Sequence, residues 1–341
     1  MEQLRYGIAI TGSGSAAPST ALDNDDLSQI VATSDDWIRP RTGIRERRLA
    51  APEESLTEFA ALAAERALTM AGLSAAELDL IVLATSTPDD LFGSASHLQA
   101  SLGASRAVAF DLTAACSGFV FGLVTAAQFV RTGAYQNVLL VGADLLSRWL
   151  DWTDRSTCVL FGDGAGAAVV RARSDGEDGL LGFEICSDGT QCDALTLSCA
   201  PKPRSLLGNV RVGSGHYQAI AMQGRDVYRF AVAQVPEAIA KALHRAQLSS
   251  QQLDWLLLHQ ANQRILDAVA QRLEMPSERV VSNLARYGNT SAASVPLALD
   301  EAVRAGQIRS RDIVATAGFG AGLSWGAAIF RWGSDGGSDR Q

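Results

Sequence analysis

The sequence predicts an α/β fold built from two similar halves. Apolar runs short enough to be buried strands alternate with segments of helical periodicity, as in sheets that are covered by helices. The segment 67–79 also recurs, with changes, at 242–254. In both places a helix end is followed by an apolar strand, at 80–84 and at 255–258. The alternation and the repeat together favour mixed sheets with mostly parallel central strands in each half.

Two further echoes extend the duplication toward the end of each half. Residues 130–133 correspond to 303–306, where a helix ends before the next strand, and residues 166–171 correspond to 326–331. The polar segment 173–179 separates the two copies. The sequence therefore divides into a first half, a second half and a flexible polar tail, at 1–173, 174–333 and 334–341.

Composition and charge restrict the class of protein. The chain has 341 residues, of which 47% are hydrophobic and 19% charged, enough for a large buried core. Its longest apolar helical stretch, 119–130, is too short to span a bilayer, and no secretory signal is visible at the N-terminus. A net charge of −8 disfavours nonspecific binding to nucleic acid or to an anionic membrane.

The five cysteines show no paired spacing, so a reducing, cytoplasmic location is expected. Cys186, Cys192 and Cys199 lack both the CxxC spacing and the nearby histidines of a metal cluster. We therefore interpret them as ordinary thiols and expect no metal site.

Cys116 is the strongest candidate for a reactive side chain. The apolar run 107–112 predicts a short buried strand, Ala114 and Ala115 permit a tight turn, and 119–130 predicts an apolar helix. A thiol at a helix N-terminus has a lowered pKa, and the free N–H groups there can stabilise an oxyanion. The alternative is that Cys116 is an inert buried thiol, as unpaired cysteines often are.

His259 and Asn289 are the candidates for its partners. His259 follows directly on the apolar strand 255–258 and occupies the position that Ala84 fills in the first half. Asn289 lies in a glycine-flanked loop. Side chains at the ends of elements can converge on one site, although a histidine at a strand end is more often structural.

Three glycine-rich stretches are expected to be sites of close backbone packing or loops, and none is expected to bind a nucleotide cofactor. The stretches 12–17 and 162–167 match a dinucleotide-binding fingerprint only loosely, because neither is followed by a helix. We expect both to permit close backbone approach. The stretch 199–217, rich in Pro, Gly and basic residues, is expected to be an irregular insertion.

Seven stretches carry distinctive motifs, at 33–37, 41–47, 114–118, 161–168, 259–262, 288–294 and 318–326. Together they resemble β-ketoacyl-acyl-carrier-protein synthase III, the condensing enzyme that initiates bacterial fatty-acid synthesis. The resemblance runs from about Thr33 to Trp332. It implies the thiolase fold, which is a duplicated α/β half in a layered αβαβα arrangement, and it implies a homodimer.

The resemblance also implies a mechanism that needs no cofactor. Cys116 would attack an acyl-CoA thioester, with acetyl-CoA the expected donor, and hold the acyl group. Malonyl-acyl-carrier protein would then lose carbon dioxide while His259 and Asn289 donate hydrogen bonds to its thioester oxygen. The resulting carbanion would attack the acyl-cysteine. The backbone N–H groups of Cys116 and Ala321 correspond to the family's oxyanion hole.

Positions that correspond to coenzyme A contacts in the family are Trp37, Arg41, Arg155 and Asn262. Phe92 corresponds to the residue that closes the acyl pocket. Arg264 and Arg272 would lie on one face of the helix expected after His259, as a basic rim for the acidic carrier protein. The alternative makes Trp37 a core anchor and the arginines solvated charges.

Four other functions are compatible with parts of the pattern. A relative from specialised metabolism could use the same Cys-His-Asn set on another acyl donor or acceptor. A plant-type polyketide synthase shares the set but fits the 33–37 and 288–294 motifs less well. A catalytically dead partner subunit would lack Cys116, and a cysteine hydrolase would need an Asp-oriented histidine.

Overall fold

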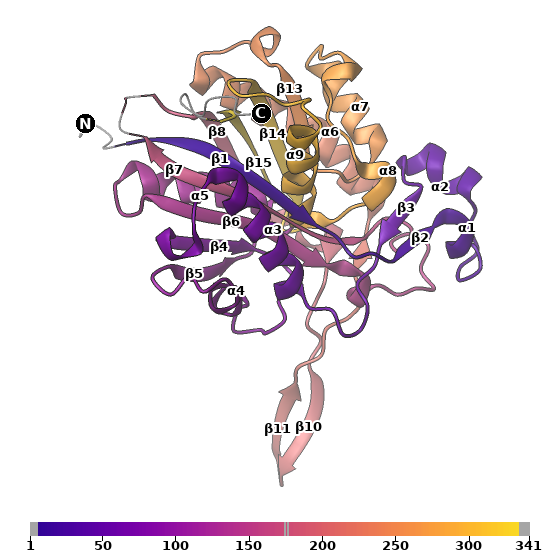
Figure 1. Ribbon diagram of the computed structural model, residues 1–341. Helices are drawn as coiled ribbons and strands as arrows, with labels where there is room; N and C mark the ends of the chain where they lie inside the picture. Colours follow the sequence, from indigo (N-terminus) through magenta and orange to yellow (C-terminus); the bar gives the residue numbers. More distant parts are fainter. Residues whose placement is uncertain (1–5, 174, 176, 334–341) are drawn as a thin grey trace.

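The computed structural model describes residues 6–173, 175 and 177–333, which fold around two main sheets (Figure 1). The tail that the sequence predicts at 334–341 lies outside the described residues. The first sheet has the strand order β1-β7-β6-β4-β5. Its strands are β1 (Gly7–Ala16), β4 (Leu80–Ala84), β5 (Val108–Leu112), β6 (Asn137–Leu145) and β7 (Asp163–Arg173).

The second sheet repeats this arrangement with the order β13-β14-β15-β8. Its strands are β8 (Leu180–Ser187), β13 (Trp255–Leu258), β14 (Ile313–Gly320) and β15 (Ser324–Arg331). Strands β8, β15, β14 and β13 of the second sheet correspond in order to β1, β7, β6 and β4 of the first sheet. Val280 adds a parallel bridge to Leu256, where the first sheet has β5. The predicted duplication is confirmed.

Both sheets are mixed, as expected, but parallel pairing makes up less of them than the sequence suggested. Within the described residues, two of four pairings in the first sheet and one of three in the second are parallel, namely β4–β5, β4–β6 and β13–β14. One antiparallel pairing, that of β14 with β15, follows from the short connection between Gly320 and Ser324, because so few residues can join only antiparallel strands.

Helices form three layers that alternate with the two sheets. The central layer holds α5 (Gly118–Arg131) and α9 (Ser294–Arg304), which pack in one core with strands of both sheets. The outer layers hold α3 (Leu56–Ala71) and α4 (Ala95–Leu102) on the first sheet, and α6 (Gly224–Ala246) and α7 (Gln263–Arg272) on the second. The predicted αβαβα layering is confirmed.

Alternation along the strands explains how a sheet can serve two helix layers. In β4, Leu80 and Val82 pack with the central helices, whereas Ile81 and Leu83 pack under α3. Successive side chains of a strand point to opposite faces, so an uninterrupted apolar run is what a doubly covered strand requires.

Small elements form a cap beside the sheets, at the right of Figure 1. They are α1 (Asn24–Leu27), α2 (Asp35–Thr42), α8 (Leu284–Tyr287), β2 (Ala21–Asp23) and β3 (Glu46–Arg48). The two-residue strands β9 (Leu195–Thr196) and β12 (Ala221–Met222) pair with each other in a separate small sheet. The described helices include none that is long and apolar enough to cross a membrane.

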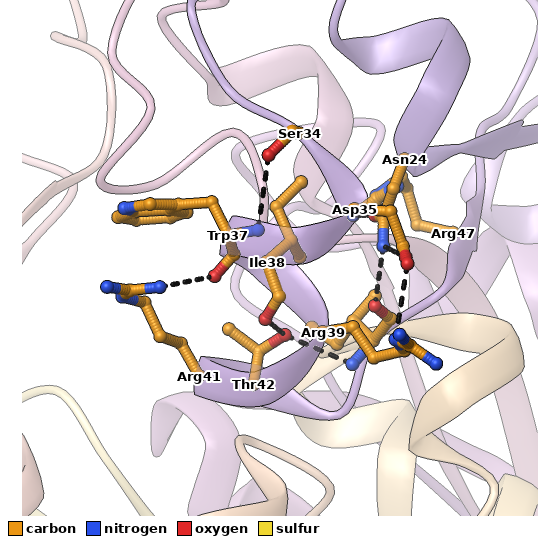
Figure 2. Close-up of polar contacts among 10 residues, drawn as sticks. Asn24, Ser34, Asp35, Trp37, Ile38, Arg39, Arg41, Thr42 and Arg47 are labelled. Atoms are coloured by element: carbon orange, nitrogen blue, oxygen red, sulfur yellow. Dashed lines mark hydrogen bonds and ion pairs between the residues drawn. The ribbon is translucent and has the colours of Figure 1, made fainter.

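A fully buried arginine ties this cap together. The Arg47 guanidinium donates to the Asn24 side-chain oxygen at 3.0 Å and to the carbonyl oxygens of Leu22 and Val159 at 3.0 and 2.8 Å. Figure 2 shows Asn24 reaching in turn to Asp35 at the start of α2. Burial lowers the pKa of Arg47 to about 10, since the charge is held mainly by neutral oxygens.

The glycine-rich stretches do what the sequence predicted. A Cβ added at Gly14 would lie 2.1 Å from the carbonyl oxygen of Ala63 in α3, and one at Gly12 would lie 2.3 Å from that of Ala67. On β7, a Cβ at Gly166 would lie 2.6 Å from the backbone nitrogen of Leu297 in α9. Both stretches therefore let helices pack directly on strand backbone.

The 199–217 segment is not the irregular insertion that we expected. It holds a two-stranded hairpin, β10 (Lys202–Leu207) with β11 (Val210–Ser214), which projects from the body at the bottom of Figure 1. The two-residue loop Gly208-Asn209, with Gly208 at φ +53°, closes it. Such a Gly-Asn pair between two short extended runs is a hairpin signal in its own right.

We retain the division of the chain after Arg173 as a proposal. It is supported by the end of β7 at that residue and by the start of the second sheet with β8. The halves share the core around α5 and α9, so they are parts of one body rather than separately folding units.

We predict that Gly14→Ala destabilises the protein, because its new methyl group would overlap the Ala63 carbonyl oxygen. Overpacking of this kind costs about 1–3 kcal/mol. Thermal denaturation followed by circular dichroism should show a lower midpoint. Gly189→Ala is the matched control, since nothing lies within 4 Å of its added methyl group. Equal midpoints for the two variants would contradict the close packing of α3 on β1.

Candidate active site

Cys116 lies on the turn that the sequence predicted between a strand and a helix. β5 ends at Leu112, the short 3-10 turn η2 (Ala115–Ser117) follows, and α5 begins at Gly118. Ala115 adopts φ +46°, a left-handed conformation that is unusual for a residue with a side chain. Strain of this kind is maintained only when the surroundings hold the turn firmly.

The end of β14 presses against this turn through glycine. A Cβ at Gly320 would lie 2.7 Å from the backbone nitrogen of Cys116, and one at Gly318 would lie 3.0 Å from the Cα of Ser117. Ala321, the next residue, lines the same large cavity as Cys116. The two backbone groups predicted to form an oxyanion hole therefore come from segments in direct contact.

His259 is held in place at the end of β13. Its backbone N–H donates to the Ala317 oxygen at 2.8 Å, its Nδ1 lies 2.6 Å from the Ser294 hydroxyl oxygen, and its ring meets Phe319 edge-on with centroids 5.2 Å apart. Burial lowers its pKa to about 3, so the imidazole is neutral at physiological pH. With Nδ1 bonded to Ser294, the other ring nitrogen remains for the cavity.

Asn289 is fixed at both its backbone and its side chain. Its N–H donates to the Leu160 oxygen at 2.8 Å, and its carbonyl oxygen accepts from Gly162 at 3.0 Å. The backbone N–H of Ser291 donates to its Oδ1 at 2.9 Å. Because the amide oxygen is occupied, the amide N–H₂ is the group left to donate into the site.

The three candidate residues meet in one narrow cavity of about 80 Å³, which Cys116, His259 and Asn289 line together. Cys116 also lines a larger neighbouring cavity of about 750 Å³. The nucleophile thus stands between a narrow chamber, which holds the side chains of His259 and Asn289, and a roomier one. Both chambers are lined mainly by apolar surface. Cys116 comes from the first half and the other two from the second half.

The thiol pKa differs from the sequence-based expectation. We expected the helix N-terminus to lower it, but burial raises the pKa of Cys116 to about 12. A contact from the Ser291 side chain opposes this shift, and the charge of Asp144 adds to it. Without substrate the sulfur is therefore protonated, and its proton must leave as the substrate is attacked.

Three of the residues expected to contact coenzyme A form one stack at the edge of the cap. The guanidinium carbon of Arg41 lies 4.8 Å from the centre of the Trp37 ring, and that of Arg155 lies 4.9 Å from it. Figure 2 shows Arg41 beside the ring, with its Nη1 donating to the Trp37 carbonyl oxygen at 3.1 Å. Trp37 is half-buried and packs against the apolar core of the cap, whereas the two arginines stacked on it are exposed.

Asn262 has a structural task in this structure. Its side-chain oxygen caps α7 by accepting from the Arg264 backbone N–H at 2.9 Å, and its Nδ2 donates to the Arg41 carbonyl oxygen at 3.0 Å. It lines the narrow cavity as well, next to His259. Its polar atoms are thus engaged in joining α2 to α7, and only part of the side chain faces the site.

The structure does not bring Phe92 to the cavity of its own chain. The Phe92 side chain is fully exposed, whereas the neighbouring Leu91 lines the larger cavity. The turn explains the difference, because the Asp90 side chain accepts the Phe92 N–H at 2.8 Å and its carbonyl oxygen accepts the Gly93 N–H. Gly93 follows with φ +109°, a backbone conformation that favours glycine.

Arg264 and Arg272 are both exposed on α7 and both reach toward α6. The Arg264 guanidinium lies 5.5 Å from the centre of the Tyr228 ring, and Arg272 Nη1 donates to the Val232 carbonyl oxygen at 3.4 Å. They share one side of the helix, as their spacing predicted.

Sequence reasoning missed three residues that support the site, namely Asp144, Ser291 and Ser294. Ser291 and Ser294 lie inside the 288–294 motif, but no local pattern indicated what they would touch. Asp144 is a polar residue at the end of the apolar strand β6, which is the same signal that drew attention to His259. No cluster of three His, Cys, Asp or Glu side chains suited to a metal is found in the part of the chain that the structure describes.

Comparison with known families agrees with this geometry. The profile described as "3-Oxoacyl-[acyl-carrier-protein (ACP)] synthase III" matches residues 110–189, and that of the "C terminal" region of the same family matches residues 243–332. The first match contains Cys116 and the second contains His259 and Asn289.

Individual relatives match almost the whole chain. A protein of Nostoc sp. named "Beta-ketoacyl-[acyl-carrier-protein] synthase III" is 67% identical, over 96% of this chain and 98% of its own length. A crystal structure of 3-oxoacyl-[acyl-carrier-protein] synthase III from Aquifex aeolicus VF5 is 42% identical with a TM-score of 0.88, covering 96% of this chain and 100% of that one. A priming β-ketosynthase from the R1128 polyketide pathway is 36% identical with a TM-score of 0.89, over 98% and 99% of the two chains.

We predict that the His259 ring stays neutral between about pH 5 and 8. Burial in the folded chain disfavours the charged imidazolium, so the pKa lies far below this window. NMR of histidine-labelled protein, with the His259 signal assigned by its loss in His259→Gln, should show no titration there. The urea-unfolded chain is the control and should titrate normally. A midpoint near the ordinary value of 6.5 in the folded protein would contradict the buried, neutral ring.

Proposed function

The chain belongs to the 3-oxoacyl-[acyl-carrier-protein] synthase III family of acyltransferases, and we propose that it joins an acyl-CoA primer to malonyl-acyl-carrier protein. The reaction is a decarboxylative Claisen condensation that yields a β-ketoacyl-carrier protein and initiates fatty-acid biosynthesis. The observation that carries the assignment of roles is the single narrow cavity lined by Cys116, His259 and Asn289. The reaction uses no cofactor in this scheme.

The first half-reaction loads the nucleophile. The Cys116 sulfur attacks the thioester carbonyl of the primer, a new carbon–sulfur bond forms, and coenzyme A leaves as a thiol with the proton that Cys116 gives up. Backbone N–H groups of Cys116 and Ala321 suit the oxyanion of the tetrahedral intermediate, because they lie on the two segments packed at Gly320. The larger cavity offers the primer chain a mainly apolar space.

The second half-reaction uses neutral hydrogen-bond donors. His259 and Asn289 donate to the thioester oxygen of the malonyl group as its carboxylate leaves as carbon dioxide. A proton-abstracting base is unnecessary, because breaking the carbon–carbon bond itself creates the enolate. The lowered pKa of His259 supports this role, since a neutral imidazole remains in place through the whole physiological range. The enolate carbon then attacks the acyl-cysteine and frees the sulfur.

The two substrates would approach from the cap side of the narrow cavity. The stack of Arg41, Trp37 and Arg155 supports a role in holding the coenzyme A nucleotide, because it offers an aromatic face and two positive charges for its phosphates. Exposed Arg264 and Arg272 supply positive charge on α7, which begins beside the cavity. A local basic surface is what an enzyme of net charge −8 needs to attract an acidic carrier protein.

We further propose that the enzyme is a homodimer that acts in the cytoplasm. Strand β5 is an edge of its sheet, with Val108 half-exposed, and the exposed Leu91 and Phe92 lie on the loop before α4. An open edge next to exposed apolar side chains supports pairing with a second copy. All five cysteines are unpaired thiols, which supports a reducing compartment.

We predict that His259→Ala and Asn289→Ala separate the two half-reactions. Each loses a donor to the enolate, so carbon dioxide release from malonyl-carrier protein should fall by about 10²–10³-fold. Transfer of acetyl from acetyl-CoA to Cys116, followed by intact-protein mass spectrometry, should persist. Cys116→Ser is the control and should fail at acyl transfer. Equal loss of both half-reactions in the alanine variants would refute this division, and acetyl found on Cys158 or Cys192 would refute the nucleophile.

We predict that Arg272→Glu weakens only the carrier substrate. The Michaelis constant for malonyl-carrier protein should rise by a factor of about 2–5, as expected for a surface ion pair. Its dependence on salt should become weaker, while acylation by acetyl-CoA stays unchanged. Arg309→Glu, a charge reversal on an exposed loop, is the matched control. Kinetic titrations at two ionic strengths check this, and equal effects of both variants would rule out docking on α7.

A further inference from the structure

A buried carboxylate lies beside the nucleophile and has no part in the chemistry described so far. Asp144, at the end of β6, is fully buried. Its Oδ1 accepts from the Ser86 N–H at 2.8 Å and from the hydroxyls of Thr87 and Thr85 at 3.1 and 3.2 Å, and its Oδ2 accepts from the Ala292 N–H at 3.1 Å. Among the described residues, these neutral donors rather than a cation hold it. A buried charge is costly to maintain, so this arrangement calls for a reason.

The contact with Ala292 crosses from the first half of the chain to the second. Ala292 lies in the 3-10 turn η7 (Ser291–Ala293), directly after the Asn289 loop. Close backbone approach makes the contact possible, because a Cβ at Gly142, two residues before Asp144, would lie 2.2 Å from the Ala292 carbonyl oxygen. The Asp144 carboxylate thus holds the turn by accepting the Ala292 N–H, at a point where the two halves of the chain are in contact.

This turn is strained and also orients Asn289. Ser291 adopts φ +51°, a left-handed conformation that costs a residue with a side chain about 1–3 kcal/mol unless its surroundings enforce it. The Ser291 N–H in turn donates to the Asn289 Oδ1 at 2.9 Å, which fixes the direction of the amide. If the turn relaxed, the amide of Asn289 would lose that bond and could rotate.

We propose that Asp144 is a positioning residue for decarboxylation: it holds the strained turn at Ser291 and Ala292 and thereby fixes the amide of Asn289 toward the malonyl thioester oxygen. The proposal rests on the role of Asn289 in the proposed function. It assigns Asp144 no contact with substrate and no proton transfer. Its effect reaches the reaction through geometry alone.

The Asp144 carboxylate also affects the Cys116 thiol. This second effect disfavours the reaction, whereas the positioning of Asn289 favours it. Burial raises the pKa of the Asp144 carboxyl group, and the hydrogen bonds that it accepts oppose this shift. In its ionised form, the carboxylate contributes to the raised pKa of Cys116, and the Ser291 side chain interacts with both groups. Removing the charge should therefore make the thiol more acidic and more reactive. A variant that merely disturbs the fold has no reason to slow one half-reaction while it speeds thiol alkylation.

The test is Asp144→Asn, which keeps the shape of the side chain. The amide oxygen can still accept from Ser86, but the amide N–H₂ would then face the Ala292 N–H, donor against donor. Carbon dioxide release from malonyl-carrier protein should fall by about 10²-fold, as for an active-site group displaced by about 1 Å. Acetyl transfer to Cys116 should persist, and alkylation of Cys116 by iodoacetamide at neutral pH should become faster.

Asp300→Asn is the matched control. Asp300 in α9 is likewise buried. It also joins the two halves, because it accepts hydrogen bonds from the hydroxyls of Ser13 and Ser15 at 2.9 and 2.6 Å. Unlike the residues around Cys116, it does not line the two cavities there. It should affect the thermal midpoint without separating the half-reactions. If Asp144→Asn does not fold, Thr87→Val removes one hydroxyl donor to Asp144 and should give a smaller loss of the same kind.

The outcomes separate the two proposals. Normal carbon dioxide release by a folded Asp144→Asn, or equal loss of both half-reactions, would overturn the role of Asp144. If Asn289→Ala is nevertheless impaired in the same assay, the proposed function stands, and only the claim that Asp144 positions Asn289 fails. Normal release by Asn289→Ala as well would overturn the role of Asn289 in the proposed function and, with it, the reason for this inference.

Discussion

The site depends on a backbone approach between the two halves that only glycine permits. Gly318 and Gly320 at the end of β14 leave no side chain between that strand and the turn at Cys116, and Gly142 does the same beneath Ala292. A Cβ at Gly320 would lie 2.7 Å from the Cys116 backbone nitrogen, and one at Gly142 would lie 2.2 Å from the Ala292 carbonyl oxygen, so a larger residue at either position would force the two segments to shift. The Cys116 turn can therefore meet the second-half residues His259 and Asn289 at contact distance, which neither half could achieve alone.

Burial at this junction determines the charge state of the reacting groups. Desolvation holds the Cys116 thiol protonated and the His259 ring neutral in the absence of substrate. These states suit a reaction whose carbanion arises by loss of carbon dioxide, since the site then needs donors with fixed directions rather than a strong base. Ser294 holds the ring and Ser291 holds the amide of Asn289, so orientation rather than acidity is what the surrounding structure provides.

Much of the fold and the central residues of the site could be predicted from local patterns. The strand before Cys116, the helix after it and the strand before His259 all follow from short apolar runs with turn residues at their ends. The hairpin β10–β11 was missed although its Gly-Asn loop was visible, because a segment rich in Pro and Gly was taken as irregular. The direction of Phe92 was not predictable, since it depends on how Asp90 bonds the turn.

By itself, the sequence determined the duplicated α/β architecture, the positions of Cys116, His259 and Asn289 at element ends, and the family to which these motifs belong. These features are periodic or local, so they can be read along the chain. Only the tertiary structure decided the raised pKa of the Cys116 thiol and the hydrogen bond by which Asn262 joins α2 to α7. It also decided the hydrogen bond between Asp144 and the turn after Asn289. Each of these depends on burial or on contact between residues far apart in the chain, and such contacts leave no pattern in one sequence.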